Sequence, residues 1–223
     1  MVPFSFAGEE MALALGQSLY WPREQALLVA DLHLEKASYY ARFGQMLPPY
    51  DSRETLGRVA EAVRQTGARR VYCLGDNFHD AAGAARLEQH AAGMLDALTR
   101  VTDWVWIAGN HDLGHVPSGT AVEELQVHGI VLRHEALPGE ARPELSGHFH
   151  PRLRISLRGR SVVRPCAVAT ASKLILPAFG ALTGGMDAAD PAIIAALQPA
   201  RSALALLGVQ GKLIQYPLWR AAA

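Results

Sequence analysis

The chain has 223 residues, half of them hydrophobic and 19% charged, and its formal net charge at pH 7 is zero. This composition provides enough apolar residues for a buried core and excludes an intrinsically disordered chain. Because the net charge is zero, any attraction to nucleic acid must come from a local patch of charge. The length fits one large domain, and we expect a single domain over residues 1–223.

The cysteines and the N-terminal residues indicate the compartment. Cys73 and Cys166 both lie in apolar runs, which favours buried thiols in a reducing compartment over a disulfide. Residues 1–15 include Glu9 and Glu10 and lack the basic start and unbroken apolar core of a signal peptide. No stretch approaches the ~20 apolar residues that span a bilayer. We therefore expect a cytoplasmic protein that does not contact membranes.

The first half of the chain alternates apolar runs with segments of helical periodicity. Apolar runs at residues 11–15 and 19–21 predict an N-terminal hairpin, and residues 26–30 predict a fully buried strand. The irregular segment 34–50 predicts a loop or a short helix, and loops of this length are usually functional.

Two helices and two further buried strands follow. Asp51 and Glu54 predict a capping box at the start of a helix over residues 52–65, which Gly67 ends. Strands are expected over residues 71–74 and 104–108, with a second helix over residues 84–98 between them. This alternation indicates a parallel α/β sheet, whose ligands bind at the carboxyl ends of its strands.

The second half of the chain predicts a second sheet built from hairpins, because its apolar runs are short and close together. These runs cover residues 130–132, 153–157, 161–163, 167–169 and 174–176. Asp190 and Pro191 predict the start of a late helix that continues to about residue 197. Strands over residues 203–207 and 213–216 are expected to follow it.

Polar residues directly follow several of these apolar runs. Gly109-Asn110-His111-Asp112 follows the run at 104–108, where an α/β sheet delivers residues to a ligand. An Asn offers a carbonyl oxygen to a metal, and the next imidazole is free for proton transfer. Alone, this tetrapeptide is also typical of an ordinary turn. The interpretation as a metal site is strengthened because seven candidate ligands each follow a short apolar stretch. They are Asp31, His33, Asp76, Asn110, His134, His148 and His150.

These candidates combine imidazoles, carboxylates and one amide, without a thiolate. Such a set suits manganese, iron, cobalt or zinc better than calcium or copper. Seven ligands are too many for one tetrahedral ion but fit two ions if Asp76, on the middle strand, bridges them. Two ions ~3.5–4 Å apart would hold a hydroxide for in-line attack on phosphorus. The competing interpretation places the histidines at 134, 148 and 150 in core or surface positions by chance.

Five motifs in this order resemble the calcineurin-like metallophosphoesterases. They are Asp31-x-His33, Gly75-Asp76, Gly109-Asn110-His111-Asp112, His134 and Gly147-His148-x-His150. The resemblance implies that one metal is held by Asp31, His33, Asp76 and His150, and a second by Asp76, Asn110, His134 and His148. It implies that His111 is the acid, near the metals but not bound to them. It also implies a four-layer α/β/β/α sandwich, with two mixed sheets flanked by helices.

A narrower resemblance, to bacterial ligase-associated DNA-damage-response endonucleases, covers most of the chain. It is carried by Glu35-Lys36, residues 44–51, Arg133-His134-Glu135 and residues 176–180. It implies a manganese-dependent phosphodiesterase or nuclease that acts on DNA or another nucleic acid, with DNA repair proteins as candidate partners. The chain departs from many family members around the bridging aspartate, where it has Gly75-Asp76-Asn77-Phe78-His79-Asp80.

Four arginines are candidate substrate contacts. Arg152, Arg154 and Arg158 alternate with apolar residues after His150, so a strand here would present a basic face beside the metal site. Such a face can contact a phosphate backbone, although it is more commonly just solvated. Arg42 lies in the segment 34–50, where a substrate contact and simple loop packing fit the sequence equally well.

Three functions are compatible with these residues. The leading hypothesis is a dinuclear metal phosphodiesterase or endonuclease whose substrate is DNA or another nucleic acid. The alternative is a phosphatase or phosphodiesterase for a small nucleotide or other small phosphate ester, which uses the same metal centre with different loops. A non-catalytic metal-binding scaffold is disfavoured, because His111 and all seven candidate ligands are present. The sequence leaves the native substrate, the resident metal and the oligomeric state open.

Overall fold

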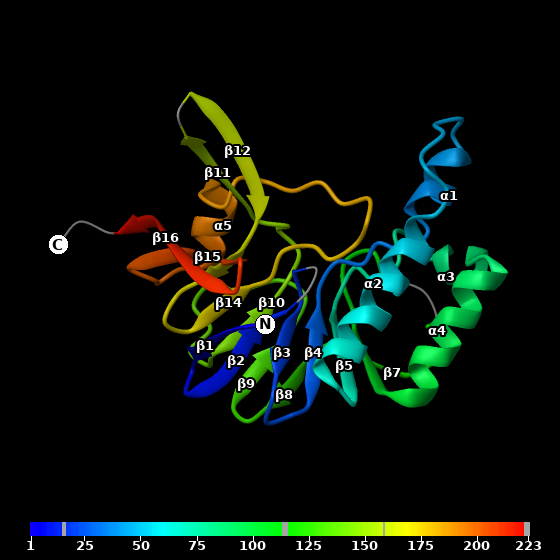
Figure 1. Cartoon of the computed structure of the whole chain (residues 1–223), viewed down its shortest axis with the longest axis horizontal. Helices are drawn as coiled ribbons and strands as arrows, with labels where there is room; N and C mark the ends of the chain where they lie inside the picture. Colours follow the sequence, from blue (N-terminus) through cyan, green and yellow to red (C-terminus); the bar gives the residue numbers. More distant parts are fainter. Residues whose placement is uncertain (15–16, 113–115, 158, 221–223) are drawn as a thin grey trace.

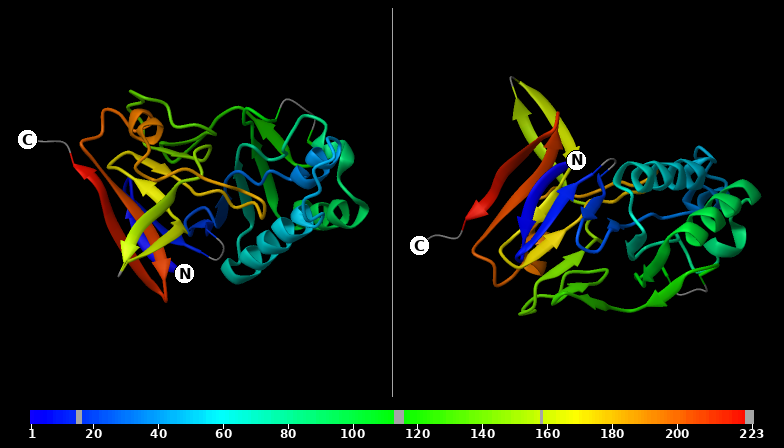
Figure 2. Two further views of the ribbon diagram at one scale, coloured as in Figure 1. Left: turned by 90° about the horizontal axis from the view of Figure 1, so that it is seen from above. Right: turned by 60° about the horizontal axis from the view of Figure 1, so that its bottom comes forward.

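Two large mixed β-sheets lie face to face in the structure, a computed structural model that describes residues 1–14, 17–112, 116–157 and 159–220 (Figures 1 and 2). The first sheet contains, in spatial order, β1 (Val2–Phe6), β2 (Glu9–Leu13), β3 (Leu19–Trp21), β4 (Ala26–Val29), β5 (Arg70–Leu74), β6 (Asp103–Ile107) and β7 (Thr120–Val122). The second contains β16 (Lys212–Arg220), β15 (Ser202–Val209), β13 (Ala167–Ala169), β14 (Lys173–Ile175), β10 (Glu144–Ser146), β9 (Ile130–Leu132) and β8 (Leu125–Val127). The helices are α1 (Lys36–Ala41), α2 (Asp51–Thr66), α3 (Gly83–Arg86), α4 (Gln89–Val101) and α5 (Pro191–Ala196).

Three clusters of buried apolar side chains separate four layers. One cluster fills the space between the two sheets and includes Leu28 and Leu174. A second lies between the first sheet and the helices α2 and α4, and it includes Leu56 of α2. A third lies between the second sheet and α5, and it includes Ile193 and Val168. The α/β/β/α arrangement expected from the sequence is therefore confirmed.

The predicted parallel strands are present as β4, β5 and β6, and β5 lies between the other two. Leu27 and Val29 of β4 face the helices, whereas Leu28 faces the second sheet, and all three are fully buried. Because both faces of this strand are covered, its sequence is a continuous apolar run.

The N-terminal region contains one strand more than expected. β2 pairs antiparallel with β3 as the predicted hairpin requires, although residues 15 and 16 lie outside the described residues. β1 precedes them and pairs with β2 from Val2 opposite Leu13 to Phe6 opposite Glu9. Pro3 interrupts the apolar pattern of β1, and a proline is compatible with a strand at the edge of a sheet.

The predicted capping box at the start of α2 is wrong. The helix begins at Asp51, and its N-cap residue Tyr50 makes no side-chain cap. Asp51 Oδ2 instead accepts a hydrogen bond from the backbone N–H of Ala37 in α1, at 3.1 Å. The carboxylate therefore fixes α1, the short helix within the segment 34–50, against the start of α2. Gly67 ends α2 with a φ of 68°, as expected.

The single helix expected over residues 84–98 is two helices, α3 and α4. The side chain of Glu88 accepts hydrogen bonds from the N–H groups of His90 and Ala91, so it caps α4. Glu88 is also paired with Arg53 of α2. The helical periodicity continues through the break, and the Glu88 cap marks where α4 begins.

The second half of the chain departs from the expected hairpin sheet at residues 152–165. β11 (Arg152–Leu157) and β12 (Arg160–Pro165) pair only with each other among the described strands, as a two-stranded ribbon. The expectation that these strands belong to the second sheet is wrong, because an apolar run identifies a strand but not its partner. The ribbon projects from the molecule on the same side as α1 (Figure 1).

The other late elements agree with the sequence or add to it. Asp190 Oδ1 accepts the N–H of Ala192 at 2.9 Å and caps α5, as predicted. Three strands of three residues each, β7, β8 and β10, were not expected, because such runs are too short to show a period. Cys73 and Cys166 are free and buried. Among the described residues, none of the helices has the length and apolar character needed to cross a membrane.

Candidate metal centre

The candidate ligands come together at the carboxyl ends of β4, β5 and β6 and in the loops that follow β9 and β10. The loops after β4 and β5 run side by side. The backbone N–H of Asp31 donates to Gly75 O at 3.1 Å, and that of His33 donates to Asp76 O at 2.9 Å. The parallel order of these strands therefore places the first two motifs next to each other.

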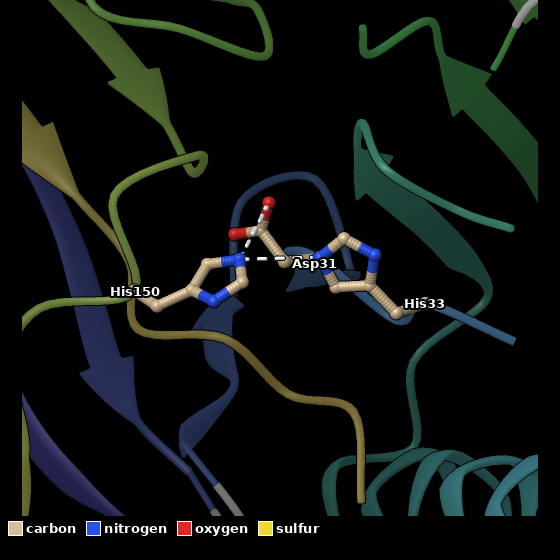
Figure 3. A group of neighbouring side chains, drawn as sticks. All are labelled: Asp31, His33 and His150. Carbon is tan, nitrogen blue, oxygen red and sulfur yellow. Dashed lines mark hydrogen bonds and ion pairs between the residues drawn. The ribbon is translucent and has the colours of Figure 1, made fainter. Parts of the chain in front are cut away.

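One ligand cluster consists of Asp31, His33 and His150, whose side chains converge in Figure 3. His33 Nε2 lies 3.3 Å from His150 Nε2, and His150 Nε2 lies 3.4 Å from Asp31 Oδ1. Asp31 and His33 are buried, and burial together with the neighbouring His150 lowers the pKa of His33 to about 2. The His33 ring is therefore neutral at ordinary pH, as a metal ligand must be.

The second cluster consists of Asp76, His134 and His148. His134 Nε2 lies 3.4 Å from Asp76 Oδ1 and 3.0 Å from His148 Nδ1. Asn110 belongs to the same group, because its Oδ1 lies 2.8 Å from His134 Nε2. All seven candidate ligands are thus brought together.

Asp76, a member of the second cluster, also faces the first. Its Oδ1 faces His134, and its Oδ2 lies 3.7 Å from His33 Nε2 in the other cluster. The clusters are also joined by Asp31, whose two carboxylate oxygens each accept the backbone N–H of His148 at 3.0 Å. A carboxylate facing both clusters is the arrangement that a bridged pair of ions requires.

The backbone at these ligands has unusual conformations. Five candidate ligands have φ in the left-handed region: Asp31 (53°), His33 (45°), Asp76 (47°), His148 (73°) and His150 (48°). Non-glycine residues rarely adopt this region, and they concentrate at functional sites when the surrounding structure holds them there. The backbone at Gly109 also lies too close to Asp76 for a side chain, because a Cβ at Gly109 would lie 2.2 Å from Asp76 N. The glycine of this motif is therefore required by close backbone contact.

Asp112 supports the site, a role that the sequence did not reveal. Its carboxylate accepts the N–H groups of Gly109 at 2.9 Å, Asn77 at 3.0 Å and Phe78 at 3.1 Å, and the Asn77 side-chain amide at 2.7 Å. These bonds tie the loop after β6 to the loop after β5, which carries Asp76. The signal available in the sequence was an acid that closes a Gly-Asn turn, a residue type that often accepts backbone N–H groups.

His111 lies beside the ligands and outside both clusters. Its Nδ1 is 2.8 Å from the carbonyl oxygen of His79, and its Nε2 is 3.9 Å from Asp76 Oδ2. The side chain is 39% exposed, whereas that of Asp76 is 4% exposed, so His111 is open to a bound substrate.

His79, for which the sequence also allowed a contact with the site, packs against His111. The two rings are stacked, with centroids 5.5 Å apart and an angle of 18° between their planes. Burial, followed by the charge of Lys36, lowers the pKa of His79 to about 4. The next residue, Asp80, pairs with Arg86 and with Arg42, so it orients these arginines and is a member of neither ligand cluster.

The four candidate arginines are separated by the structure. Arg42 follows α1, where its 54% exposed side chain lies 3.7 Å from Asp80. Arg154 is also exposed, and it pairs with Asp187 at 3.7 Å. Arg152, at the base of the ribbon, lines a cavity together with His150. Arg158 lies outside the described residues.

The residues present fit two divalent ions. In each cluster of three the ligand atoms all lie within 4.8 Å of one another. Two imidazole nitrogens bound ~2.1 Å from one ion would be about 3.0–3.4 Å apart, and the histidine pairs here are 3.3 and 3.0 Å apart. The donors are the imidazoles, carboxylates and amide that first-row divalent ions accept.

A family model and solved structures are similar to this chain. The model of the calcineurin-like phosphoesterase family matches residues 25–156, a range that includes His111 and all the candidate ligands. The chain is similar to the crystal structure of Pseudomonas putida nuclease MPE, at 28% identity and a TM-score of 0.71, over 96% of this chain and 98% of that chain. Yfce, a phosphoesterase from E. coli, is similar at 18% identity and a TM-score of 0.40, over 82% of this chain and 87% of that chain. No curated protein matches the sequence.

Proposed function

Because the chain belongs to the calcineurin-like phosphoesterase family and is a metal-dependent phosphoesterase, we propose that it hydrolyses phosphodiester bonds of nucleic acid. The observation that carries the proposal is the pair of ligand clusters that Asp76 joins, with His111 beside them. The similarity to the Pseudomonas putida nuclease, which extends over nearly all of both chains, supports a nucleic acid as the substrate. We propose DNA as that nucleic acid and DNA repair as the context, on the narrower resemblance of the local runs.

The proposed ligand assignment follows the two clusters. One ion is assigned to Asp31, His33, Asp76 and His150, and the other to Asp76, Asn110, His134 and His148. Manganese is the proposed ion, because mixed imidazole and carboxylate ligands suit it, and iron, zinc and cobalt are the alternatives. When bound, two such ions supply Lewis-acid polarisation of the phosphoryl group and activation of the attacking water.

His111 is proposed to donate a proton to the leaving oxygen of the substrate. Its Nδ1 is directed at a backbone carbonyl, so this nitrogen carries a proton and holds the ring in place. Nε2 is then the nitrogen that gains and loses the transferred proton. The exposed position of the ring allows Nε2 to reach a substrate oxygen, whereas Asp76 and His134 are buried.

The experiment that tests the proposal compares three substrates. Protein reconstituted with manganese is assayed on an aryl phosphodiester, an aryl phosphomonoester and supercoiled DNA. We expect hydrolysis of the diester and nicking of the DNA, both dependent on metal. Hydrolysis of the monoester alone would contradict the proposal and would support the alternative, a phosphatase for small phosphate esters.

A further inference from the structure

A cavity of about 150 Å³ lies beside His150, between the base of the β11–β12 ribbon and the loop at residues 177–184. Its walls include Arg58, His150, Arg152, Gly180, Thr183 and Gly184, and none of the described residues that line it is acidic. One water needs ~10–15 Å³ of such space, so the cavity holds a group considerably larger than a water. Its size and lining therefore suit a hydrated anion.

Arg152 is the unusual side chain of this cavity. Its backbone is fixed on both sides, since its N–H donates to Met186 O and its carbonyl accepts the N–H of Ala188, both at 2.9 Å. Its Nε is buried without a hydrogen-bond partner among the described residues. A buried N–H without an acceptor costs about 1–3 kcal/mol, so the arrangement favours an acceptor from outside the chain.

Two other arginines near the cavity have carboxylate partners. Arg58, across the cavity, pairs with Glu54, and Arg154, farther along β11, pairs with Asp187. Within the described residues the guanidinium of Arg152 has no carboxylate partner, although it lies closest along the chain to the ligand His150. Its charge therefore remains free to bind an anion in the cavity.

A glycine loop fixes the position of Arg152. A Cβ at Gly185 would lie 2.2 Å from His150 O and 2.8 Å from Arg152 Cδ. The loop thus packs directly on both residues, and it limits the conformations that the arginine stem can adopt. The position of the guanidinium is in this way tied to that of His150.

We propose that this cavity binds the phosphate next to the scissile phosphate of the substrate strand, with Arg152 as its main contact. The inference rests on the proposed function, because the phosphate in question is the next one along a nucleic acid or oligonucleotide strand. His150 belongs both to the first ligand cluster and to the cavity wall, so a phosphate held here is adjacent to the one at the metal centre. The planar fork of a guanidinium suits two phosphate oxygens at once.

The test uses the full-length protein, reconstituted with manganese, and three dinucleotides. These are thymidylyl-thymidine without a terminal phosphate, with a 5′-phosphate and with a 3′-phosphate. Wild-type protein should cleave one of the two phosphorylated dinucleotides with a kcat/KM ~10- to 100-fold above that of the unphosphorylated one, the effect of one charged hydrogen-bonded contact. Using both isomers shows on which side of the scissile bond the cavity lies.

Variants of Arg152 test whether this residue causes the higher kcat/KM of the phosphorylated dinucleotide, called the advantage below. Arg152→Gln should abolish the advantage, and Arg152→Lys should retain part of it, because the charge remains but the fork is removed. Arg164→Gln is the matched control, since Arg164 lies on β12 opposite Leu153, on the other face of the ribbon. It should keep the full advantage, and thermal unfolding and metal content verify that each variant is folded.

The outcomes separate this inference from the proposed function. Hydrolysis of all three dinucleotides at equal kcat/KM would overturn the phosphate cavity and leave the diesterase proposal intact. Full retention of the advantage in folded Arg152→Gln would overturn the role of Arg152. Failure to cleave any diester, together with hydrolysis of a monoester, would overturn the proposed function itself.

Discussion

His111 Nδ1 lies 2.8 Å from the carbonyl oxygen of His79, and this contact defines the chemistry open to the ring. A carbonyl only accepts hydrogen bonds, so Nδ1 must carry a proton and Nε2 is the nitrogen available for proton transfer. The nearby Asp76 Oδ2 is 3.9 Å from that Nε2. His111 is thus held beside the metal centre by a backbone group, and it does not depend on a metal for its position.

The first prediction separates the acid from the ligands. His111→Ala should retain both metals and lose ~10²–10⁴-fold in turnover, the usual effect of removing a positioned acid–base group. Asp76→Ala should lose metal, because its carboxylate faces both clusters. Metal analysis and steady-state kinetics of the two variants check this. Equal metal content in the two variants would contradict the assigned roles.

The second prediction concerns the metals themselves. Exhaustive chelation should abolish hydrolysis of an aryl diester, and manganese should restore it better than magnesium, because histidine-rich ligation favours borderline ions. Activity is measured after titration of each ion into the chelated protein. Full activity in the chelated protein would rule out the metal-dependent reaction.

The third prediction concerns Asp112. Asp112→Ala removes the acceptor of several N–H groups in the loops after β5 and β6. Each buried N–H left without an acceptor costs about 1–3 kcal/mol, and each kcal/mol lowers the Tm of a chain of this size by about 2–4 °C. Tm and metal content should both fall. Asp112→Asn keeps one carbonyl acceptor, so its Tm and metal content should lie between those of wild type and Asp112→Ala. A Tm and metal content equal to wild type in Asp112→Ala would show that the two loops keep their positions without the Asp112 carboxylate.

The fourth prediction concerns DNA binding by the ribbon. Arg152 and Arg154 lie two residues apart on β11, and so share one face. Replacing Arg152, Arg154 and Arg158 with Ser should weaken DNA binding and reduce the salt slope by roughly 0.7–0.9 for each phosphate that the variant no longer binds. Binding is measured over a series of salt concentrations. If affinity and slope stayed at the wild-type values, these arginines would make no contact with DNA phosphates.

Much of the site could be predicted from sequence because its ligands follow local patterns. Strands buried on both faces are continuous apolar runs, and a parallel sheet places its ligands where these runs end. The runs before Asp31, Asp76 and Asn110 therefore identified both the strands and the ligands. The order β4-β5-β6 also made Asp76 the central carboxylate.

Other features were decided only by contacts between residues far apart in the chain. The His33–His150 contact spans 117 residues, and no local period indicates it. Asp51 contacts α1 instead of capping its own helix, and Glu88 begins α4 beside Arg53 of another helix. In each case the local sequence does not identify the partner, and the packing of distant segments brings the two residues together.

The arginines of β11 show most clearly which features follow from local sequence and which depend on tertiary contacts. Alternation along the strand predicted a basic face, and it treated Arg152 and Arg154 as equivalent. In the folded chain Arg154 is paired with Asp187, whereas Arg152 lines a cavity with His150 and has a buried Nε without a partner among the described residues. Local sequence determines which residues a strand presents, because side chains alternate with period two. Which of them acquires a partner depends on the loops that fold against the strand, and only the tertiary structure brings those loops into contact.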